Sequence, residues 1–209
     1  MVDISFISIT NQEYKPWASR VFQSVRDALK SYPIKYSYEF ILCSPEEPQV
    51  PEKDVIWVKD EINKPGNAVY ALNKAFHFSS GKYIFTLNDD HTMPDYKPLK
   101  AVEFLRSDLF KDRRFKVTSI GASWNCNIYG STTIPNLHFP PPLPLQLSIE
   151  LQKQKYLVRP NRYLILGYPV FDRKTVVNEL KGFLFNPSFK SHYADNFLPF
   201  FLGESGEEP

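Results

Sequence analysis

The stretch YIFTLNDDHTMPD, residues 83–95, decides how the sequence can be interpreted. It begins with an apolar run typical of a buried strand, and this run ends in four polar residues, Asn88-Asp89-Asp90-His91. Adjacent carboxylates repel each other and raise each other's pKa. An acidic turn in solvent explains an Asp-Asp pair by itself. The rest of the chain must therefore indicate whether these carboxylates have a positively charged partner.

Composition indicates an ordered globular protein without a preference for nucleic acid. The 209 residues are 43% hydrophobic and 23% charged, with a formal net charge of +2. This length suffices for one large domain with a sizeable core. The two signs of charge are interspersed and give no basic footprint for nucleic acid. The basic cluster at 111–116 is interpreted as a solvated helix end rather than a phosphate-binding patch.

Targeting and cysteine signals predict a cytoplasmic protein without a membrane span. The N-terminus lacks the basic region of a signal peptide, and no apolar run approaches the roughly 18 residues that span a bilayer. Cys43 and Cys126 lie in apolar or strand-like contexts without metal-site spacing. This favours two buried thiols in a reducing compartment over one disulfide.

Hydrophobic periodicity predicts alternating strands and helices over the first part of the chain. Strands are expected at 3–10, 38–43, 54–58, 82–87 and 117–124, and helices at 17–30, 67–78 and 99–109. This alternation predicts an α/β domain with a mainly parallel central sheet flanked by helices. Ligands bind outside the carboxyl ends of the strands in such sheets. Three polar strand exits are therefore expected to gather at one edge: Thr10-Asn11, Ser44-Pro45-Glu46 and Asn88 to His91.

The pattern changes after Cys126, where proline becomes frequent. Residues 135–144 (PNLHFPPPLP) are expected to form an extended surface segment and neither helix nor central strand, because proline lacks an N–H donor and fixes its own backbone. A recognition peptide for an SH3-type domain is the alternative for this segment. Helices are also predicted at 145–155 and 175–180, and a strand at 163–166.

Five motifs resemble the GT-A glycosyltransferases, in particular the inverting family-2 type. In chain order they are ISITN, EFILCS, NKPGNAVYALNKAF, GKYIFTLNDDH and GFLFNPSFKSHYADNFL. The resemblance covers nearly the whole chain and is strongest over 4–105. It implies one GT-A (Rossmann-like) domain over 1–209, with a nucleotide-sugar-binding half at 1–125 and an acceptor-side half at 126–209. The small size is also similar to single-domain glycosyltransferases of large DNA viruses, for which the compartment would be the host cytoplasm.

The resemblance implies a metal-dependent, inverting enzyme. Such an enzyme moves a hexose from a nucleotide diphosphate sugar, with uridine as the expected base, to a hydroxyl of a glycan or glycoconjugate acceptor. Carboxylates at this strand end bind Mn²⁺ or Mg²⁺ in the family, and the cation neutralises charge on the leaving nucleoside diphosphate. With a cation present, adjacent carboxylates are no longer unfavourable.

The resemblance assigns roles to the four polar residues after the strand. Asp90 matches the metal-binding carboxylate, and Asp89 matches a residue that meets the ribose or assists the metal. His91 either reaches the metal or faces solvent. Asn88 stands where an acid is commoner, which leaves the acidic signature incomplete and places Asn88 among the nucleotide-sugar contacts.

Further nucleotide contacts are expected from the first two strand exits. Thr10 matches the end of the family's first strand, where the chain approaches the base. Ser44 lies near the position of a base-reading aspartate, and Glu46 is the candidate substitute. Ordinary turn chemistry is the alternative for these residues.

The segment ahead of the helix at 67–78 resembles the family's glycine-containing approach to the nucleotide. Gly66 permits close backbone approach, and the helix start at Asn67 offers N–H donors to an anion. Lys64 and Asn73 are candidates to hold donor oxygens, although Asn73 is equally well explained as a satisfied buried amide. The group at 124–127 lies where such enzymes shape the sugar pocket, with packing as the alternative.

The catalytic base is expected in the second half of the chain, because a sugar hydroxyl must lose its proton as it attacks. The resemblance places it at Asp195 in HYADNFL, where Ala194 replaces the more usual acid. An Asp in this position is also a good helix N-cap, and the two roles can coexist. Asp172 is the competing carboxylate, and His192 is a further candidate base or metal ligand. Three arginines are candidates for the diphosphate, with surface ion pairs as the alternative: Arg159, Arg162 and Arg173.

Two other functions remain open. A nucleotidyltransferase uses a similar sheet and metal to make nucleotide sugars, but it usually carries a Gly-rich loop after the first strand. The corresponding segment TNQEYKPWASR contains no glycine. A non-catalytic nucleotide-sugar-binding module would keep the fold without turnover, and the substitutions Asn88 and Ala194 keep this alternative open.

Overall fold

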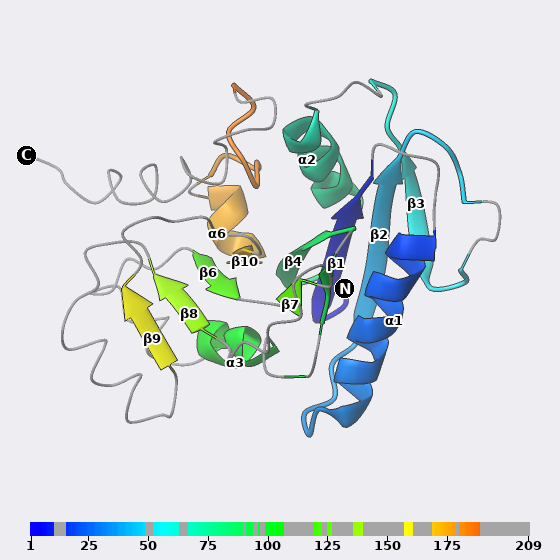
Figure 1. Cartoon of the computed structure of the whole chain (residues 1–209). Helices are drawn as coiled ribbons and strands as arrows, with labels where there is room; N and C mark the ends of the chain where they lie inside the picture. The colour runs from blue at the N-terminus through cyan, green and yellow to red at the C-terminus, as the bar shows by residue number, and fades with distance from the viewer. Residues whose placement is uncertain are drawn as a thin grey trace, which may run out of the picture.

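The structure, a computed structural model, describes residues 1–10, 16–48, 52–62, 67–89, 91–93, 96, 99–106, 119–122, 125–126, 136–139, 157–160, 169–178 and 180–188. These residues form an α/β domain in which helices flank a central sheet, as predicted from the alternation of strands and helices (Figure 1). The strand order in the sheet is β3-β2-β1-β4-β10-β6-β8-β9.

The first four strands of the sheet are parallel. β1 (Ile4–Ile9) lies between β2 (Tyr38–Ser44) and β4 (Tyr83–Asn88), and β3 (Val55–Lys59) pairs with the outer side of β2. Their apolar, β-branched and aromatic residues suit strands that helices cover on both faces. The predicted ranges agree with these four strands to within about one residue at each end.

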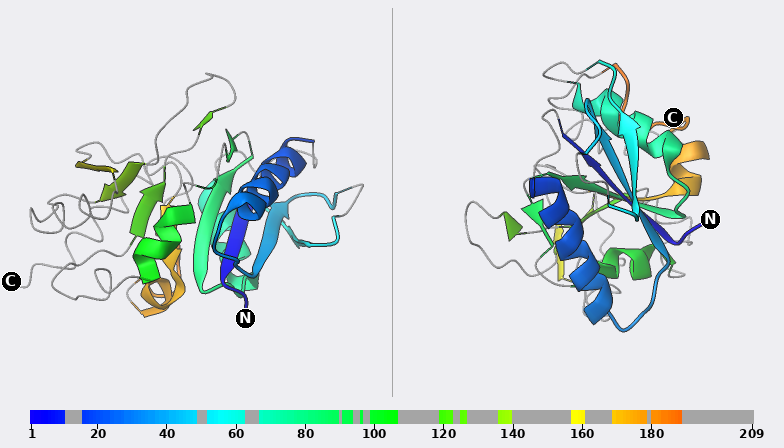
Figure 2. Two further views of the ribbon diagram at one scale, coloured as in Figure 1. Left: turned by 90° about the horizontal axis from the view of Figure 1, so that it is seen from below. Right: turned by 90° about the vertical axis from the view of Figure 1, so that its right-hand side faces the viewer.

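Helices pack against both faces of the sheet (Figure 2). α1 (Pro16–Ser31) and α3 (Lys100–Arg106) share one core cluster with Phe6, Phe40 and Phe85 of the strands. α2 (Ala68–Phe78) and α6 (Arg173–Asn178) share the other cluster with the opposite side chains of the same strands. None of the helices in the described part of the chain is long and apolar enough to cross a bilayer.

The second half of the chain completes the sheet with a mixed set of strands. β10 (Pro169–Asp172) runs antiparallel to both β4 and β6 (Ser119–Ala122). β8 (Asn136–Phe139) pairs antiparallel with β6 and parallel with β9 (Leu157–Pro160). Neighbouring strands in this part of the sheet therefore come from distant parts of the sequence, as β10 does beside β4.

The expectation that 135–144 contains no central strand was wrong for residues 136–139. β8 pairs with β6 on one side and with β9 on the other. Its sequence NLHF has no proline, and Pro135 and Pro140 bracket it, so the prolines bound the strand without removing its ladder donors. β10 was not predicted, and it begins at Pro169, where a missing N–H is tolerated. The predicted helix at 145–155 and strand at 163–166 lie outside the described residues.

A hydrogen-bonded cluster fixes the start of β4 at the amino edge of the sheet. The Gly81 N–H donates to the Ser5 hydroxyl (2.7 Å), which in turn donates to a carboxylate oxygen of Glu39 (2.6 Å). A Cβ atom on Gly81 would overlap the backbone nitrogen and the hydroxyl of Ser5. Only glycine therefore fits without moving β1, and this close approach positions β4 and the residues at its other end.

Candidate functional site

The predicted strand exits lie side by side at the carboxyl edge of the sheet. Ile9, the last residue of β1, is in register with Cys43 of β2 on one side and with Asn88 of β4 on the other. The next residue, Thr10, donates its N–H to the Cys43 carbonyl (3.1 Å). The three exits expected to gather therefore follow neighbouring strands at one edge, which is where α/β sheets bind ligands.

The hydroxyl of Ser44 holds the exit of β2 in place. It accepts a hydrogen bond from the indole N–H of Trp57 (3.0 Å) and donates to the Glu46 carbonyl (2.8 Å). Ser44 is fully buried, whereas the side chain of Glu46 is exposed. The serine hydroxyl has thus used its one donor within the protein, and Glu46 is the more accessible of the two predicted base contacts.

Asp60 follows β3 at the same edge and was not predicted as a site residue. Asp60 is 2% exposed, donates its N–H to the Ser44 carbonyl (2.8 Å) and accepts from the Ile62 N–H (3.0 Å). Burial, and secondarily the negative charge of Asp60, raises the pKa of the free Cys43 thiol to about 12. The sequence signal for Asp60 was its position directly after the strand DVIWVK. The carboxyl group of Asp60 therefore shapes the turn into 61–62 at this edge.

The turn that carries the acidic motif leads from β4 into a separate two-stranded ribbon. Asp89, which is partly exposed, follows β4 directly, and β5 (His91–Thr92) pairs antiparallel with β7 (Asn125–Cys126). This pairing brings part of the predicted sugar-pocket group at 124–127 alongside the acidic turn. Asp90 and the side chains of Asn88 and His91 lie outside the described residues.

The chemistry of this turn fits a divalent cation. Carboxylate oxygens are the ligands that Mg²⁺ and Mn²⁺ prefer, with imidazole as an acceptable addition for transition metals. Within the described side chains, no group of three His, Cys, Asp or Glu residues forms a metal site. Asp89 is the described carboxylate at the turn, and Asp90 and His91 adjoin it in the sequence.

The amino end of α2 lies beside this edge, and Asn67 precedes it. Asn67 makes no side-chain capping hydrogen bond, while its carbonyl accepts from the Ala71 N–H (3.1 Å). Its side-chain nitrogen Nδ2 is buried and has no hydrogen-bond partner among the described residues. A buried donor of this kind is costly unless a ligand or water satisfies it. Gly66 and Lys64 lie outside the described residues.

Asn73 clamps the segment at 184–185 onto α2. Its side-chain oxygen accepts from the N–H groups of Leu184 (2.9 Å) and Phe185 (3.1 Å), and its side-chain nitrogen donates to the Phe185 carbonyl (2.8 Å). Asn73 is 6% exposed. These contacts are those of the satisfied buried amide, which was the alternative for this residue, and a contact between Asn73 and the nucleotide sugar stays a prediction.

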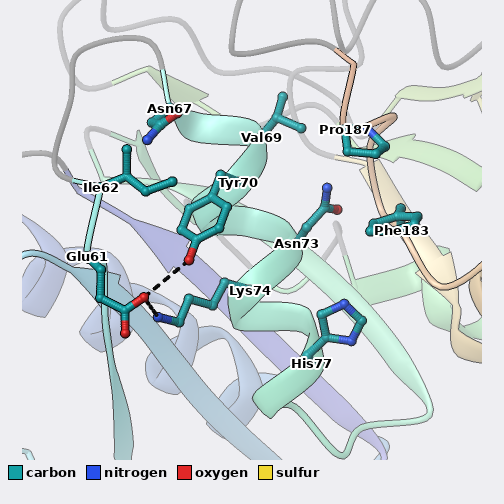
Figure 3. A pocket seen from close by; sticks show the side chains of 10 residues that line it. All are labelled: Glu61, Ile62, Asn67, Val69, Tyr70, Asn73, Lys74, His77, Phe183 and Pro187. Atoms are coloured by element: carbon teal, nitrogen blue, oxygen red, sulfur yellow. Dashed lines mark hydrogen bonds and ion pairs between the residues drawn. The ribbon is translucent and has the colours of Figure 1, made fainter.

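A pocket of about 510 Å³ runs along α2 from Asn67 to His77 (Figure 3). One wall carries Glu61, which is 2.8 Å from Lys74 and accepts from the Tyr70 hydroxyl (3.3 Å). The ammonium group of Lys74 lowers the pKa of the Glu61 carboxyl. The other wall is formed by Phe183 and Pro187, which belong to the segment that Asn73 holds. The pocket therefore lies between α2 and the segment that contains Phe183 and Pro187.

Replacing Asn73 with alanine should lower the free energy of unfolding by about 3 kcal/mol, because three buried hydrogen bonds are lost and two N–H groups are left without a partner. Urea unfolding followed by fluorescence measures this change. The matched control is Asn178→Ala, since Asn178 is exposed on α6. An Asn73→Ala protein that unfolds at the same urea concentration as the wild type would contradict the clamp.

Two predicted candidates lie at the wrong edge of the sheet. Asp172 is in register with Tyr83 at the start of β4, five residues from Asn88, which corresponds to about 17 Å at roughly 3.3 Å per residue. It is 8% exposed and accepts from the Thr175 N–H (3.2 Å), so it caps α6. The prediction of Asp172 as a competing catalytic base is therefore wrong.

Arg173 is likewise excluded as a diphosphate ligand. Its guanidinium donates to the Gly81 carbonyl (2.6 Å) and to the Ser79 hydroxyl (2.5 Å), ahead of β4, and lies 4.7 Å from the centre of the Phe76 ring. Burial lowers the pKa of this guanidinium. The remaining candidates Asp195, His192 and Arg162, and the side chain of Arg159, lie outside the described residues.

Comparisons with known proteins support the fold. No protein-family model matches the sequence, and no curated protein matches it. The structure resembles a mannosyltransferase from Pyrobaculum calidifontis, solved in complex with GDP-Man and Mn²⁺, with a TM-score of 0.55 and 13% sequence identity over 95% of this chain. It also resembles S. aureus TarS 1-349, with a TM-score of 0.54 and 11% identity over 96% of this chain.

The same TarS fragment in complex with UDP gives a TM-score of 0.51 at 11% identity and covers 93% of this chain. The matches span 50%, 55% and 53% of the three solved chains, so this chain corresponds to about half of their length. At such low identity the likeness shows the shared fold. The predicted α/β class with a mainly parallel central sheet is confirmed.

Proposed function

We propose that this chain is a metal-dependent, inverting glycosyltransferase that moves a hexose from a nucleotide diphosphate sugar to a hydroxyl of a glycan acceptor. The observation that carries the proposal is the carboxyl edge, where Thr10, the β2 exit and Asp89 follow neighbouring strands. Two of the solved proteins that share the fold were captured with GDP-Man and Mn²⁺ or with UDP, which supports a nucleotide-sugar donor here.

The nucleotide is proposed to lie across the ends of β1 and β2. Thr10 approaches the base, Glu46 supplies the accessible carboxylate at the β2 exit, and Asp89 meets the ribose. The Asn67 side-chain nitrogen, which has no partner in the described part of the chain, and the first N–H groups of α2 offer donors to anionic or sugar oxygens. UDP is proposed as the first nucleotide to test, with GDP as the competing one.

The diphosphate is proposed to lie at the turn after β4. Asp90, with Asp89 and His91 beside it, would hold Mn²⁺ or Mg²⁺, which neutralises negative charge on the departing nucleoside diphosphate. The protein's part is to place oxygen ligands at one turn and to fix that turn through the β5 and β7 pairing. This arrangement accounts for two adjacent carboxylates at the end of a buried strand.

Transfer is proposed to occur by one direct displacement. The acceptor hydroxyl attacks the anomeric carbon from the face opposite the leaving phosphate, which inverts the configuration. Asp195 is proposed to take the proton of that hydroxyl, because the second half of the chain is proposed to form the acceptor side. With Asp172 excluded, Asp195 is the strongest carboxylate candidate that the sequence offers for this role.

A thermal-shift series with UDP, GDP and their sugar conjugates, each with Mn²⁺ and with EDTA, tests the donor class. A ligand at about 100 times its Kd stabilises the native state by about 2.7 kcal/mol, which corresponds to a rise in Tm of roughly 5–10 °C at this chain length. We expect this rise for a nucleotide sugar with Mn²⁺. No shift with any nucleotide would contradict the proposal.

Turnover then separates the enzyme from its two rivals. A glycosyltransferase releases nucleoside diphosphate as it transfers the sugar. Transfer to water is slow, and transfer to an acceptor is faster. A nucleotidyltransferase releases pyrophosphate from a nucleoside triphosphate and a sugar phosphate instead. Binding of the nucleotide sugar with no release of either product would favour the non-catalytic module.

A further inference from the structure

Ser24 of α1 makes a hydrogen bond to the chain that leaves the acidic turn. The Met93 N–H donates to the Ser24 hydroxyl (2.8 Å), and the same hydroxyl donates to the Val21 carbonyl one turn earlier in the helix (2.6 Å). A serine hydroxyl has one donor and two acceptor positions, so both bonds form at once. The bond to Met93 joins residues 69 positions apart in the sequence.

Met93 is the first residue after β5 and is only 3% exposed in the core cluster under α1 and α3. Its side chain is therefore held by packing, and its N–H is held by Ser24. On its other side the acidic turn is continuous with β4, and β5 pairs with β7. The segment between Asn88 and Met93 is thus fixed at both ends.

Helix formation does not require serine at position 24. Alanine is a better helix former, because serine hydroxyls compete for backbone hydrogen bonds. Alanine there would, however, leave the Met93 N–H without its protein partner. The contact to Met93 is the feature of this position that the helix itself does not explain.

We infer that Ser24 is a positioning residue for the acidic turn: its hydroxyl fixes the backbone of Met93 and thereby the backbone of β5, which follows the acidic turn at the carboxyl edge. The inference rests on the proposed function, since it concerns the turn that is proposed to hold the cation and the diphosphate. Ser24 itself touches neither.

The test compares Ser24→Ala with Ser24→Thr and with the control Ser31→Ala. Ser31 lies on the same helix and donates the same kind of bond to the carbonyl three residues earlier (2.9 Å to Ala28), so its loss reproduces the effect on the helix alone. Threonine keeps the hydroxyl. Calorimetry measures the Kd of UDP and of GDP with Mn²⁺ and with EDTA, and hydrogen exchange measures the protection of the Met93 amide.

We expect Ser24→Ala to weaken Mn²⁺-dependent binding of the nucleotide by about 3- to 10-fold, the equivalent of one net hydrogen bond, and to leave binding in EDTA unchanged. The Met93 amide should exchange at least about 10-fold faster. Ser24→Thr and Ser31→Ala should bind within about twofold of the wild type. A general loss of stability would lower both affinities, whereas a displaced turn lowers only the Mn²⁺-dependent one.

Unchanged Mn²⁺-dependent binding in Ser24→Ala would overturn the inference and leave the proposed function standing. A wild-type Met93 amide that exchanges as an open amide would also overturn it, even if Ser24→Ala did not fold. A wild-type protein whose binding of UDP and GDP is the same in Mn²⁺ and EDTA would overturn the proposed metal site, and the inference with it.

Discussion

Replacing Asp90 with alanine should lower sugar transfer by at least about 100-fold and abolish the effect of Mn²⁺ on the binding of nucleoside diphosphate. Loss of this carboxylate removes the main oxygen ligand proposed at the turn, so the diphosphate would meet Asp89 without charge compensation. Calorimetry of UDP and GDP with Mn²⁺ and with EDTA measures the effect of the metal on binding. Steady-state transfer or hydrolysis of the nucleotide sugar measures the loss of activity.

The matched control is Asp27→Ala, which removes one negative charge from an exposed position of α1. Asp27 contacts Gln23 and Lys30 of the same helix, and exposed pairs of this kind contribute little to stability. The control should keep both activity and Mn²⁺ dependence. Equal affinity of the wild type for nucleotide in Mn²⁺ and in EDTA would remove the metal hypothesis.

Replacing Asp195 with asparagine should lower transfer by roughly 10²–10⁴-fold while donor affinity stays within about threefold, the result expected for a lost general base. Asparagine keeps the size of the side chain and its ability to cap a helix, so a capping role alone predicts little change. Donor affinity is measured by calorimetry and transfer by product formation. NMR of the product should show an anomeric configuration opposite to that of the donor.

Asp172→Asn is the control for this variant. Asp172 accepts from the Thr175 N–H at the start of α6, and asparagine can accept the same bond. Because this cap lies about 17 Å from the acidic turn at roughly 3.3 Å per strand residue, transfer should be near normal. Retained anomeric configuration, or near-normal transfer by Asp195→Asn, would refute the displacement mechanism and leave the fold and the metal site unaffected.

The candidate site could be predicted from the sequence only where strand ends carry polar residues. Thr10, the β2 exit and Asp89 were placed correctly at one edge, because parallel strands that follow one another along the chain bring their carboxyl ends together. The roles of individual side chains did not follow from this placement. Ser44 donates its hydroxyl to the nearby Glu46 carbonyl and accepts from Trp57, and the second contact depends on the pairing of β3 with β2.

By itself the sequence determined the parallel half of the domain. The four parallel strands and the helices α1, α2 and α3 follow from periodic burial, because a residue's neighbours along the chain already specify which face is apolar. The need for glycine at position 81, before β4, is evident only in the structure, since the backbone of β1 leaves no room for a Cβ atom.

Only the tertiary structure decided the contacts between residues distant in sequence. Asn73 became a clamp because the segment at 184–185 packs on α2, and Arg173 became a ligand of the Gly81 carbonyl because β10 enters the sheet antiparallel beside β4. The same is true of Ser24 and Met93, whose bond has no local signature. Periodicity reports which face of an element is buried, and it carries no information on which partner buries it.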